Sequence, residues 1–167
     1  MLPVSILRSG LMLILVLSLS LVSNAQAKPE HGKKFKDWTI ACEKLPSSGK
    51  EMCSVVQVLS SENKNVTIQI AITYPPGKTE PHALFKLPLG VSLRHGIEFS
   101  AGKAKVALPY TVCMQQGCIV NGKLDKDMIS AMKKASEGVI KFAAMPNKVV
   151  GAKVSLSGFT AALKSLK

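Results

Sequence analysis

The chain has 167 residues, and its 22 Lys and Arg outnumber its 10 Asp and Glu, which gives a net charge of +12 at pH 7. Nearly all the positive residues are lysines, which are solvated point charges rather than the planar forks that suit phosphates and base edges. They are dispersed along the chain, as in Lys33, Lys34, Lys103, Lys105, Lys133 and Lys134. Because no nucleic-acid-binding module and no interleaving of aromatic and basic residues occurs, we expect no nucleic-acid partner. The charge is interpreted as a solvated basic surface, with adhesion to an anionic envelope or host-surface component as the alternative.

Residues 1–27 have the layout of a secretory signal peptide. Arg8 supplies positive charge, Leu11 to Val22 form an apolar run broken only by two serines, and Ala25-Gln26-Ala27 has the small-x-small pattern that signal peptidase accepts. A spanning helix needs about 20 apolar residues, and this run is shorter. We therefore predict cleavage after Ala27, which removes one charge and leaves a mature protein of net charge +11 without a membrane span.

The mature chain is predicted to begin with a flexible segment, residues 28–34, followed by one domain, residues 35–167. This length is enough for one modest hydrophobic core. The domain begins with two predicted strands, Trp38 to Cys42 and Cys53 to Leu59, joined by a loop rich in Pro, Ser and Gly. Trp38 is interpreted as a core or rim anchor, with an exposed ligand-stacking residue as the alternative.

The four cysteines, Cys42, Cys53, Cys113 and Cys118, indicate disulfides because the chain is predicted to be exported. Three pairings are possible: 42–53 with 113–118, 42–113 with 53–118, and 42–118 with 53–113. The local pairing is favoured, since adjacent strands would bring the first two cysteines together.

The last two cysteines flank Met-Gln-Gln-Gly, between the apolar stretches Tyr110 to Cys113 and Cys118 to Asn121. This pattern favours a hairpin with a four-residue loop, in which Gly117 takes a positive φ. A metal site would need further ligands, and His31, His82 and His95 are scattered. A redox pair would favour Cys-x-x-Cys at a helix N-terminus. The spacing therefore favours a disulfide across the hairpin, with a labile disulfide or a metal site as alternatives.

The stretch Val66 to Tyr74 alternates apolar and polar residues over nine positions, which predicts a half-buried strand. Short strands separated by turn residues follow, and their spacing indicates an antiparallel β-sandwich or barrel. The expected ranges are Ala83 to Leu87, Val91 to Leu93, Ile97 to Ser100, Lys105 to Leu108, Val139 to Ala144 and Val149 to Leu156.

Two helices are predicted. One begins after Asp125 as its N-cap, carries Lys133 and Lys134 in its last turn, and ends at Gly138. The other is indicated by Phe159, Ala162, Leu163 and Leu166, at i, i+3, i+4 and i+7. It is expected to cover one end of the sheets, and the serines before it are expected to end a strand and to provide the N-cap.

The ordered stretches of this chain resemble the invasion-associated locus B family of exported proteins of Gram-negative bacteria, some of which are linked to invasion of erythrocytes. The resemblance rests on FKDWTIACE (Phe35 to Glu43), Cys53 with Gln57, FKLPLGVSLRHGIEF (Phe85 to Phe99), CMQQGC (Cys113 to Cys118) and VSLSGFTAAL (Val154 to Leu163). It implies an immunoglobulin-like β-sandwich with two local disulfides, located in the periplasm or at the outer cell surface. It implies no catalytic residue and no cofactor.

The residues themselves also indicate no catalytic, cofactor-binding or metal site. No Gly-x-Ser-x-Gly elbow, Gly-rich phosphate loop or His-Glu-x-x-His motif occurs, and Ser155 and Ser157 lack a neighbouring base in the sequence. Arg94-His95 is read as a solvated turn, with an anion site as the alternative. Our hypothesis is a non-enzymatic, basic envelope or surface protein that assists virulence by binding at a surface. The alternative is a small periplasmic enzyme or enzyme inhibitor acting on envelope polymers.

Overall fold

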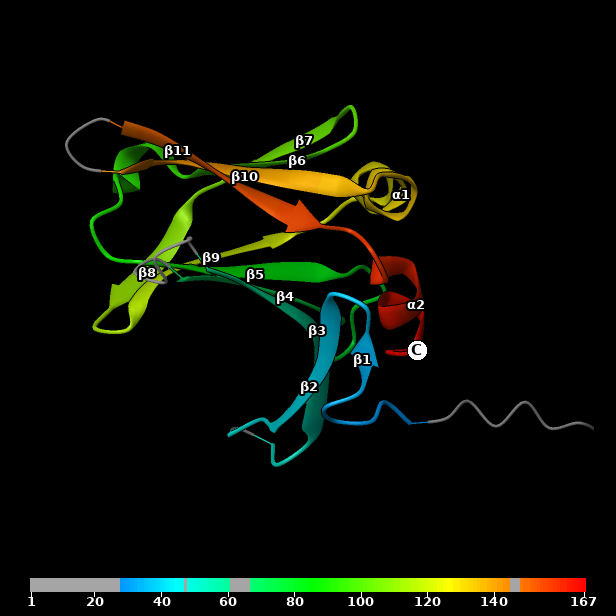
Figure 1. Ribbon diagram of the computed structural model, residues 1–167. Helices are drawn as coiled ribbons and strands as arrows, with labels where there is room; N and C mark the ends of the chain where they lie inside the picture. Colours follow the sequence, from blue (N-terminus) through cyan, green and yellow to red (C-terminus); the bar gives the residue numbers. More distant parts are fainter. Residues whose placement is uncertain (1–27, 47, 61–66, 145–147) are drawn as a thin grey trace, which may run out of the picture.

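The computed structural model describes residues 28–46, 48–60, 67–144 and 148–167 (Figure 1). The predicted signal peptide, residues 1–27, lies outside the described residues. The described chain forms two antiparallel sheets, two α-helices and one short 3-10 helix. The mainly β architecture expected from the sequence is therefore confirmed.

The larger sheet has seven strands in the order β1-β2-β3-β4-β5-β9-β8. Their bounds are β1 Lys34–Phe35, β2 Trp38–Lys44, β3 Glu51–Ser60, β4 Thr67–Thr73, β5 His82–Leu87, β8 Tyr110–Met114 and β9 Gly117–Lys123. The smaller sheet has the order β11-β10-β6-β7, with β6 Ile97–Ala101, β7 Ala104–Leu108, β10 Glu137–Ala144 and β11 Lys148–Ser155. Figure 1 shows the smaller sheet above β4, β5 and β9, while β2 and β3 turn away from that layer.

The core lies between the two sheets. In β4 the side chains of Ile68, Ile70 and Ile72 are buried, as the period-two pattern predicts, and the alternate residues face outward. Across the interface Phe85 of β5 meets Phe99 of β6 with ring centroids 5.4 Å apart. Aromatic contact between the inner faces holds the two layers together.

The predicted strand Val91 to Leu93 is wrong. Only Val91 pairs, in an isolated bridge with Ala144, and the chain then forms the 3-10 helix η1 (Leu93–His95). Gly90, at φ 84°, bends the chain out of β5 toward the smaller sheet. Because Gly96 also has a positive φ, an extended strand has no room between these two turns.

The first helix, α1 (Lys126–Lys134), begins as predicted. The Oδ1 atom of Asp125 accepts a hydrogen bond of 2.7 Å from the backbone N–H of Met128. The predicted stop at Gly138 is wrong, since the helix ends before Ala135 and Gly138 lies in β10. Gly138 is small for a packing reason: a Cβ there would come within 3.1 Å of the Phe99 ring.

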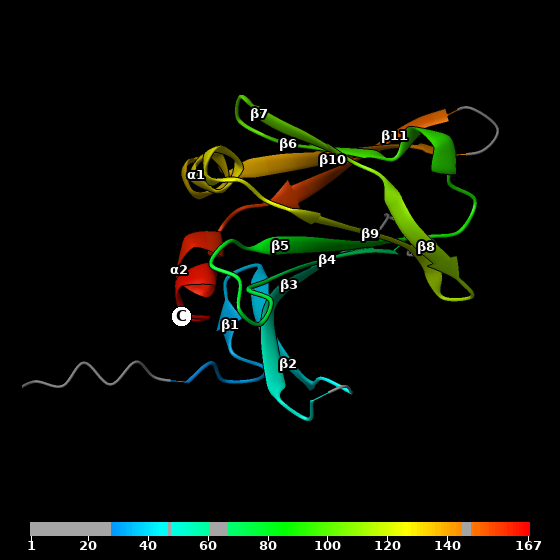
Figure 2. The same ribbon diagram turned by 180° about the vertical axis from the view of Figure 1, so that it is seen from behind.

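The second helix, α2 (Phe159–Lys164), buries Phe159, Ala162 and Leu163, as its apolar stripe predicts. Its N-cap is Gly158 in a left-handed conformation, so the predicted serine N-cap is wrong. Both α-helices lie at one end of the sandwich together with the β6–β7 turn, and we call this the helical end (Figures 1 and 2). The β5–β6 connection, the β8–β9 hairpin and the start of β11 lie at the opposite end, called the loop end.

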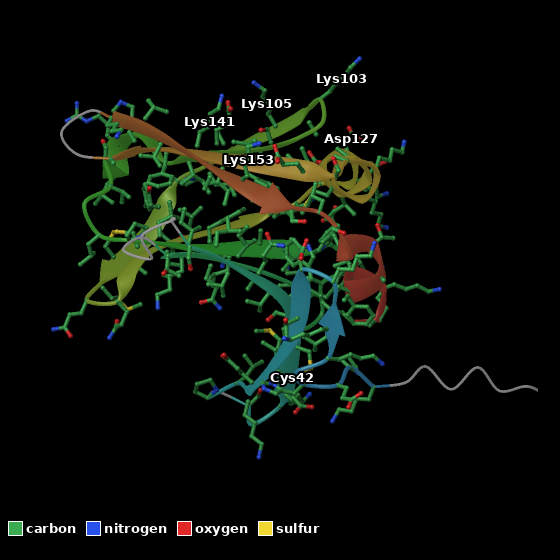
Figure 3. All side chains as sticks on the ribbon, in the orientation of Figure 1. Cys42, Lys103, Lys105, Asp127, Lys141 and Lys153 are labelled. Atoms are coloured by element: carbon green, nitrogen blue, oxygen red, sulfur yellow. A yellow bond between two sulfur atoms is a disulfide. The ribbon has the colours of Figure 1, made fainter. Side chains whose placement is uncertain are left out.

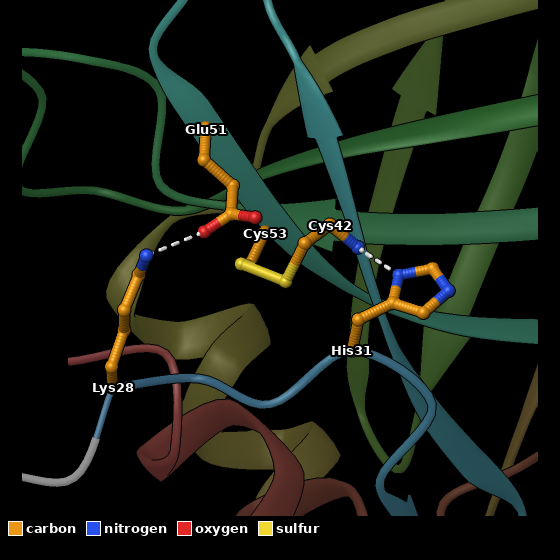
Figure 4. Close-up of polar contacts among 5 residues, drawn as sticks. All are labelled: Lys28, His31, Cys42, Glu51 and Cys53. Atoms are coloured by element: carbon orange, nitrogen blue, oxygen red, sulfur yellow. Dashed lines mark hydrogen bonds and ion pairs between the residues drawn. A yellow bond between two sulfur atoms is a disulfide. The ribbon is translucent and has the colours of Figure 1, made fainter.

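Residues of the segment 28–34, which is predicted to be flexible, contact β2 and β3 (Figure 4). The Lys28 ammonium lies 2.8 Å from the Glu51 carboxylate, and His31 Nδ1 accepts a hydrogen bond of 3.0 Å from the Cys42 N–H. The hydrogen bond to Lys28, more than its charge, lowers the pKa of Glu51. Lys34 already belongs to β1. The segment therefore makes specific contacts that its composition does not indicate.

Candidate functional surfaces

The two disulfides join Cys42 to Cys53 and Cys113 to Cys118. In each case the two cysteines face one another directly across a pair of antiparallel strands. The second bridge closes the β8–β9 hairpin, where the ladder continues to Met114 and Gly117, so the connection has two residues instead of the four expected. Both bridges are local, which is the pairing that the sequence favours.

Residues from three of the family-like stretches meet at one buried polar contact between the sheets. The side chain of Gln57, 5% exposed on the inner face of β3, binds both backbone groups of Ser155 at the end of β11. Its Nε2 donates to the Ser155 carbonyl at 2.9 Å, and its Oε1 accepts from the Ser155 N–H at 3.0 Å. We call this contact, with its partners Asp37 and Trp38, the Gln57 clamp.

Two further side chains complete the Gln57 clamp. The indole N–H of Trp38 donates to the same Ser155 carbonyl at 3.0 Å, and the Ser155 hydroxyl donates to the Asp37 carboxylate at 2.6 Å. The Trp38 ring is fully buried and lies 5.2 Å from the Phe159 ring of α2. The interpretation of Trp38 as a core anchor is therefore confirmed, and the clamp fixes the direction in which the chain leaves β11 for α2.

Gln57 is part of the family resemblance in the sequence, but its role in joining the two sheets was not predicted. The signal was present in the alternation of β3, where Cys53, Val55, Gln57 and Leu59 share a face. An amide on an otherwise apolar inner face needs a partner, because a buried polar group without a hydrogen bond is costly. The partner, Ser155, is 98 positions away in the chain, and no local pattern points to it.

Of His82 and His95, only His95 has a hydroxyl group within hydrogen-bond distance in the described residues. His82 faces outward from β5 opposite Thr73 and Lys123. His95 Nδ1 lies 3.0 Å from the Ser92 hydroxyl, a contact within one turn of chain. Glu98 lines the same shallow groove as His95, but its carboxylate has a recorded contact, at 3.9 Å, with Lys105.

Within residues 28–46, 48–60, 67–144 and 148–167, no three His, Cys, Asp or Glu side chains are grouped as metal ligands would be. None of the helices in this same part of the chain has the length and apolar character needed to cross a bilayer.

Six lysines from separate parts of the sequence lie close together at the helical end. Two shallow grooves flank α1: Lys103 and Lys134 line one, and Lys126, Lys133 and Lys167 line the other. Lys164 is exposed on α2 beside them. Asp127, which Figure 3 labels together with Lys103, also lines the first groove. Asp127 is exposed on α1, whereas the Asp125 carboxylate caps the helix.

Elsewhere, several lysines have acidic partners. On the outer face of the smaller sheet, Lys105 lies 3.9 Å from Glu98 and Lys153 lies 3.3 Å from Glu137. Lys141 stands on the same face, as Figure 3 shows. Among the described residues no ion pair is recorded for the six lysines of the helical end, Lys103, Lys126, Lys133, Lys134, Lys164 and Lys167. These six lysines therefore form a cluster of positive charge, beside which Asp127 lines the first groove and Glu80, paired with Lys123 at 2.6 Å, lines the second.

One buried hydroxyl at the edge of the larger sheet also stands out. Tyr110, in β8, carries a buried hydroxyl group for which the described residues offer no hydrogen-bond partner. Burial raises the pKa of Tyr110 to about 12. The residue stands beside an irregularity in the β8–β9 register, where Thr111 is skipped in the pairing.

The chain is similar to known proteins in sequence and in fold. The chain is 26% identical over 138 residues to an invasion protein B homolog of Brucella abortus (strain 2308), covering 80% of this chain and 77% of that protein. A homolog from Brucella abortus biovar 1 (strain 9-941) matches equally. The crystal structure of invasion associated protein B from Bartonella henselae superposes with a TM-score of 0.71 at 19% identity, over 80% of this chain and 92% of that one.

That structural likeness shows the fold, and the family is shown by the sequence. The sequence model of the invasion associated locus B (IalB) proteins matches residues 38–167, which is most of the chain. The matched range begins at Trp38 and includes Gln57 and Ser155, both disulfides and both helices, while Asp37 of the clamp precedes it. The chain belongs to the invasion associated locus B family.

Proposed function

We propose that this protein is exported through its N-terminal signal to the periplasm or outer surface of a Gram-negative bacterium. There it assists invasion of host cells, such as erythrocytes, as a non-enzymatic protein that binds an anionic surface through its helical end. The observation that carries the proposal is the gathering of Lys103, Lys126, Lys133, Lys134, Lys164 and Lys167 around α1 and α2 without recorded acidic partners.

The electrostatic argument is direct. Each lysine held close to an anionic surface contributes about 1 kcal/mol to binding, and the effect fades beyond the Debye length. The clustered lysines are all exposed, and among the described residues none of them has an ion pair to break on approaching such a surface. The Lys167 ammonium lies 4.7 Å from the centre of the Tyr74 ring and would exchange that cation–π contact for the surface. A lipid A phosphate, an acidic glycan or a sialylated host surface offers the same negative charge.

The non-enzymatic part of the proposal is supported by what the candidate groups do. The Ser155 hydroxyl donates to Asp37, and the Ser155 backbone is held by Gln57, so this serine serves the contact between the sheets. His95 is engaged with Ser92 within a single turn. If the purified protein hydrolysed an envelope polymer and Ser92→Ala abolished that activity, the alternative of a small periplasmic enzyme would replace this proposal.

The test uses residues 28–167, which include every described strand and helix. It compares two triple variants that lose the same number of positive charges. Lys126, Lys133 and Lys134 change to Gln in one, and the exposed Lys44, Lys50 and Lys78 change to Gln in the control. On immobilised heparin or lipopolysaccharide, we expect the first variant to bind at least tenfold more weakly at low salt and to elute at lower salt. Equal elution of the two variants, or capture that high salt does not weaken, would contradict the proposal.

A further inference from the structure

Most of the large apolar side chains that are exposed in the described residues lie at the loop end. There are seven in all, and the two outside this group, Val58 and Leu84, lie on the outer face of the larger sheet. The other five, with their exposed fractions, are Leu89 57%, Leu93 56%, Val112 46%, Met114 52% and Val149 70%. Such a concentration on one end indicates an interaction surface.

These side chains come from three separate connections that the fold holds side by side. Leu89 and Leu93 belong to the β5–β6 connection, and the backbone between them is tied to β10 by a hydrogen bond of 2.7 Å from the Ser92 N–H to the Ala143 carbonyl. Val149 pairs with Ala143 in the register of β10 and β11, so it lies close to that connection. Figures 1 and 2 both place the connection and the start of β11 at the same end.

The third connection is the β8–β9 hairpin, which carries Val112 and Met114. The Cys113–Cys118 bridge closes it. Gly117 lies so close to the Leu87 carbonyl that a Cβ there would overlap it, which places the hairpin against the end of β5. The hairpin that carries two of the apolar tips is therefore cross-linked and packed against the end of β5.

Most of the charge beside these tips is positive, and the exception is Glu98, which lines the same groove as Val149. Arg94, the only arginine after residue 27, stands exposed in η1, and Lys148 is exposed at the start of β11. The stretches 86–97, 109–120 and 148–152 contain no Asp or Glu. Glu98, the nearest carboxylate in sequence, has Lys105 beside it at 3.9 Å.

We propose that the loop end is a membrane-contact surface, which inserts Leu89, Leu93, Met114 and Val149 into the interface of an anionic phospholipid bilayer. Apolar side chains can bury in the boundary between headgroups and acyl chains, while adjacent cations bind anionic headgroups. Arg94 and Lys148 match that charge. A bilayer is deformable and accepts tips from separate connections, whereas a rigid protein partner needs a complementary patch of about 800 Å².

A second copy of this chain fits the surface less well. In a two-fold dimer through the loop end, the same patch would face itself, so the cations of one copy would approach those of the other with no carboxylate between them. The proposal is independent of the proposed function, because the lysines considered there lie at the opposite end of the sandwich (Figure 1). A protein with both properties would bridge a bilayer and a separate anionic surface.

The test is co-sedimentation of residues 28–167 with vesicles of phosphatidylcholine containing about one third phosphatidylglycerol. The variant replaces Leu89, Leu93 and Val149 with Ser, and the control replaces Leu84, which is exposed on the larger sheet, with Ser. We expect the loop-end variant to lose at least tenfold in vesicle partitioning and to bind heparin unchanged. The control should partition like the unaltered protein.

A second measurement keeps the proposal testable if a variant fails to fold. A tryptophan introduced by Leu93→Trp should shift its emission to the blue with vesicles and be quenched by brominated lipid, while Leu84→Trp should do neither. Three outcomes would overturn the proposal: unchanged partitioning of the loop-end variant, partitioning lost only with Lys126, Lys133 and Lys134 changed to Gln, or self-association without vesicles that Leu93→Ser abolishes.

Discussion

The two ends of this sandwich solve the same problem differently. Every β-sandwich has two open ends where the core would meet water. At the helical end, α2 buries Phe159 and Leu163, α1 buries Met128 and Met132, and the surface that remains is rich in lysine. At the loop end no α-helix is described, and the connections themselves form the cover with large apolar residues left exposed.

The stretches that are distinctive in the sequence differ in whether the fold buries or exposes them. Three of the stretches that identify the family contribute Asp37, Trp38, Gln57 and Ser155 to the Gln57 clamp, and those groups hold the sheets together. The stretch Phe85 to Phe99, in contrast, combines buried strand residues with the exposed Leu89 and Leu93. A distinctive motif can therefore be structural at one end of a domain and be displayed to solvent at the other.

The largest expected effect comes from adding one methyl group at each end. Gly158 and Gly90 have nearly the same positive φ, 86° and 84°. A Cβ on Gly158 would overlap the carbonyl oxygen of Phe35, whereas nothing lies within 4 Å of the corresponding position at Gly90. Gly90→Ala should cost about 1–2 kcal/mol, the usual penalty of a left-handed non-glycine residue. Gly158→Ala should cost about 3–5 kcal/mol, because β1 and α2 must also move apart.

Urea denaturation of the two alanine variants measures both values under the same conditions. Equal losses would mean that the contact between β1 and the start of α2 yields easily, and that the helical end is less tightly closed than its burial indicates.

Local signals in the sequence predicted most of the strands and both helices, and the failures have physical reasons. The alternation that buries Ile68, Ile70 and Ile72 is a property of neighbouring residues. Gly138 was read as a helix stop, but it is small because Phe99, from another strand, packs against it. The division of strands into sheets of seven and four depends on pairings such as β5 with β9, which no short stretch contains.

The candidate surfaces were harder to predict than the fold. Lys103 and Lys134 line one groove although three strands and most of a helix separate them in the chain. The local sequence predicts that Leu93 lies in a strand. In the structure, Gly90 and Gly96 turn the chain on either side of it, and it lies in η1 instead. Exposure at the loop end is decided by the fold, so composition alone does not indicate it.

The next effect tests whether α2 is a closing element or an anchor. Leu163 is 2% exposed and Lys164, its neighbour, points to solvent. Leu163→Ala should lower the free energy of unfolding by about 2–4 kcal/mol, the usual range for a buried leucine, and Lys164→Ala should leave it nearly unchanged. Thermal melts with a membrane-sedimentation assay check this. An unchanged melting temperature for Leu163→Ala, with loss of surface association, would identify the stripe as an exposed anchor.

The last stability effect concerns the two disulfides, both of which close short loops. The chain-entropy model gives each about 2–3 kcal/mol, slightly more for Cys42–Cys53, whose partners are 11 positions apart, than for Cys113–Cys118, which are 5 apart. We therefore expect reduction to lower the melting temperature clearly without unfolding the domain at room temperature. Non-reduced peptide mapping should recover both local bridges, and a peptide linking the regions of Cys42 and Cys113 would contradict the structure.

The Cys113–Cys118 disulfide cross-links only the loop end, so removing it tests whether the two ends are stabilised independently. Replacing Cys113 and Cys118 with Ala removes the cross-link from the hairpin that displays Met114, while the hydrogen bonds of the Gln57 clamp stay in place. Amide hydrogen exchange should then rise in β8 and β9 and remain slow in α2, since local opening reports local support. Faster exchange in α2 as well would show that the two ends are coupled through the larger sheet, and that the closed end depends on the open one.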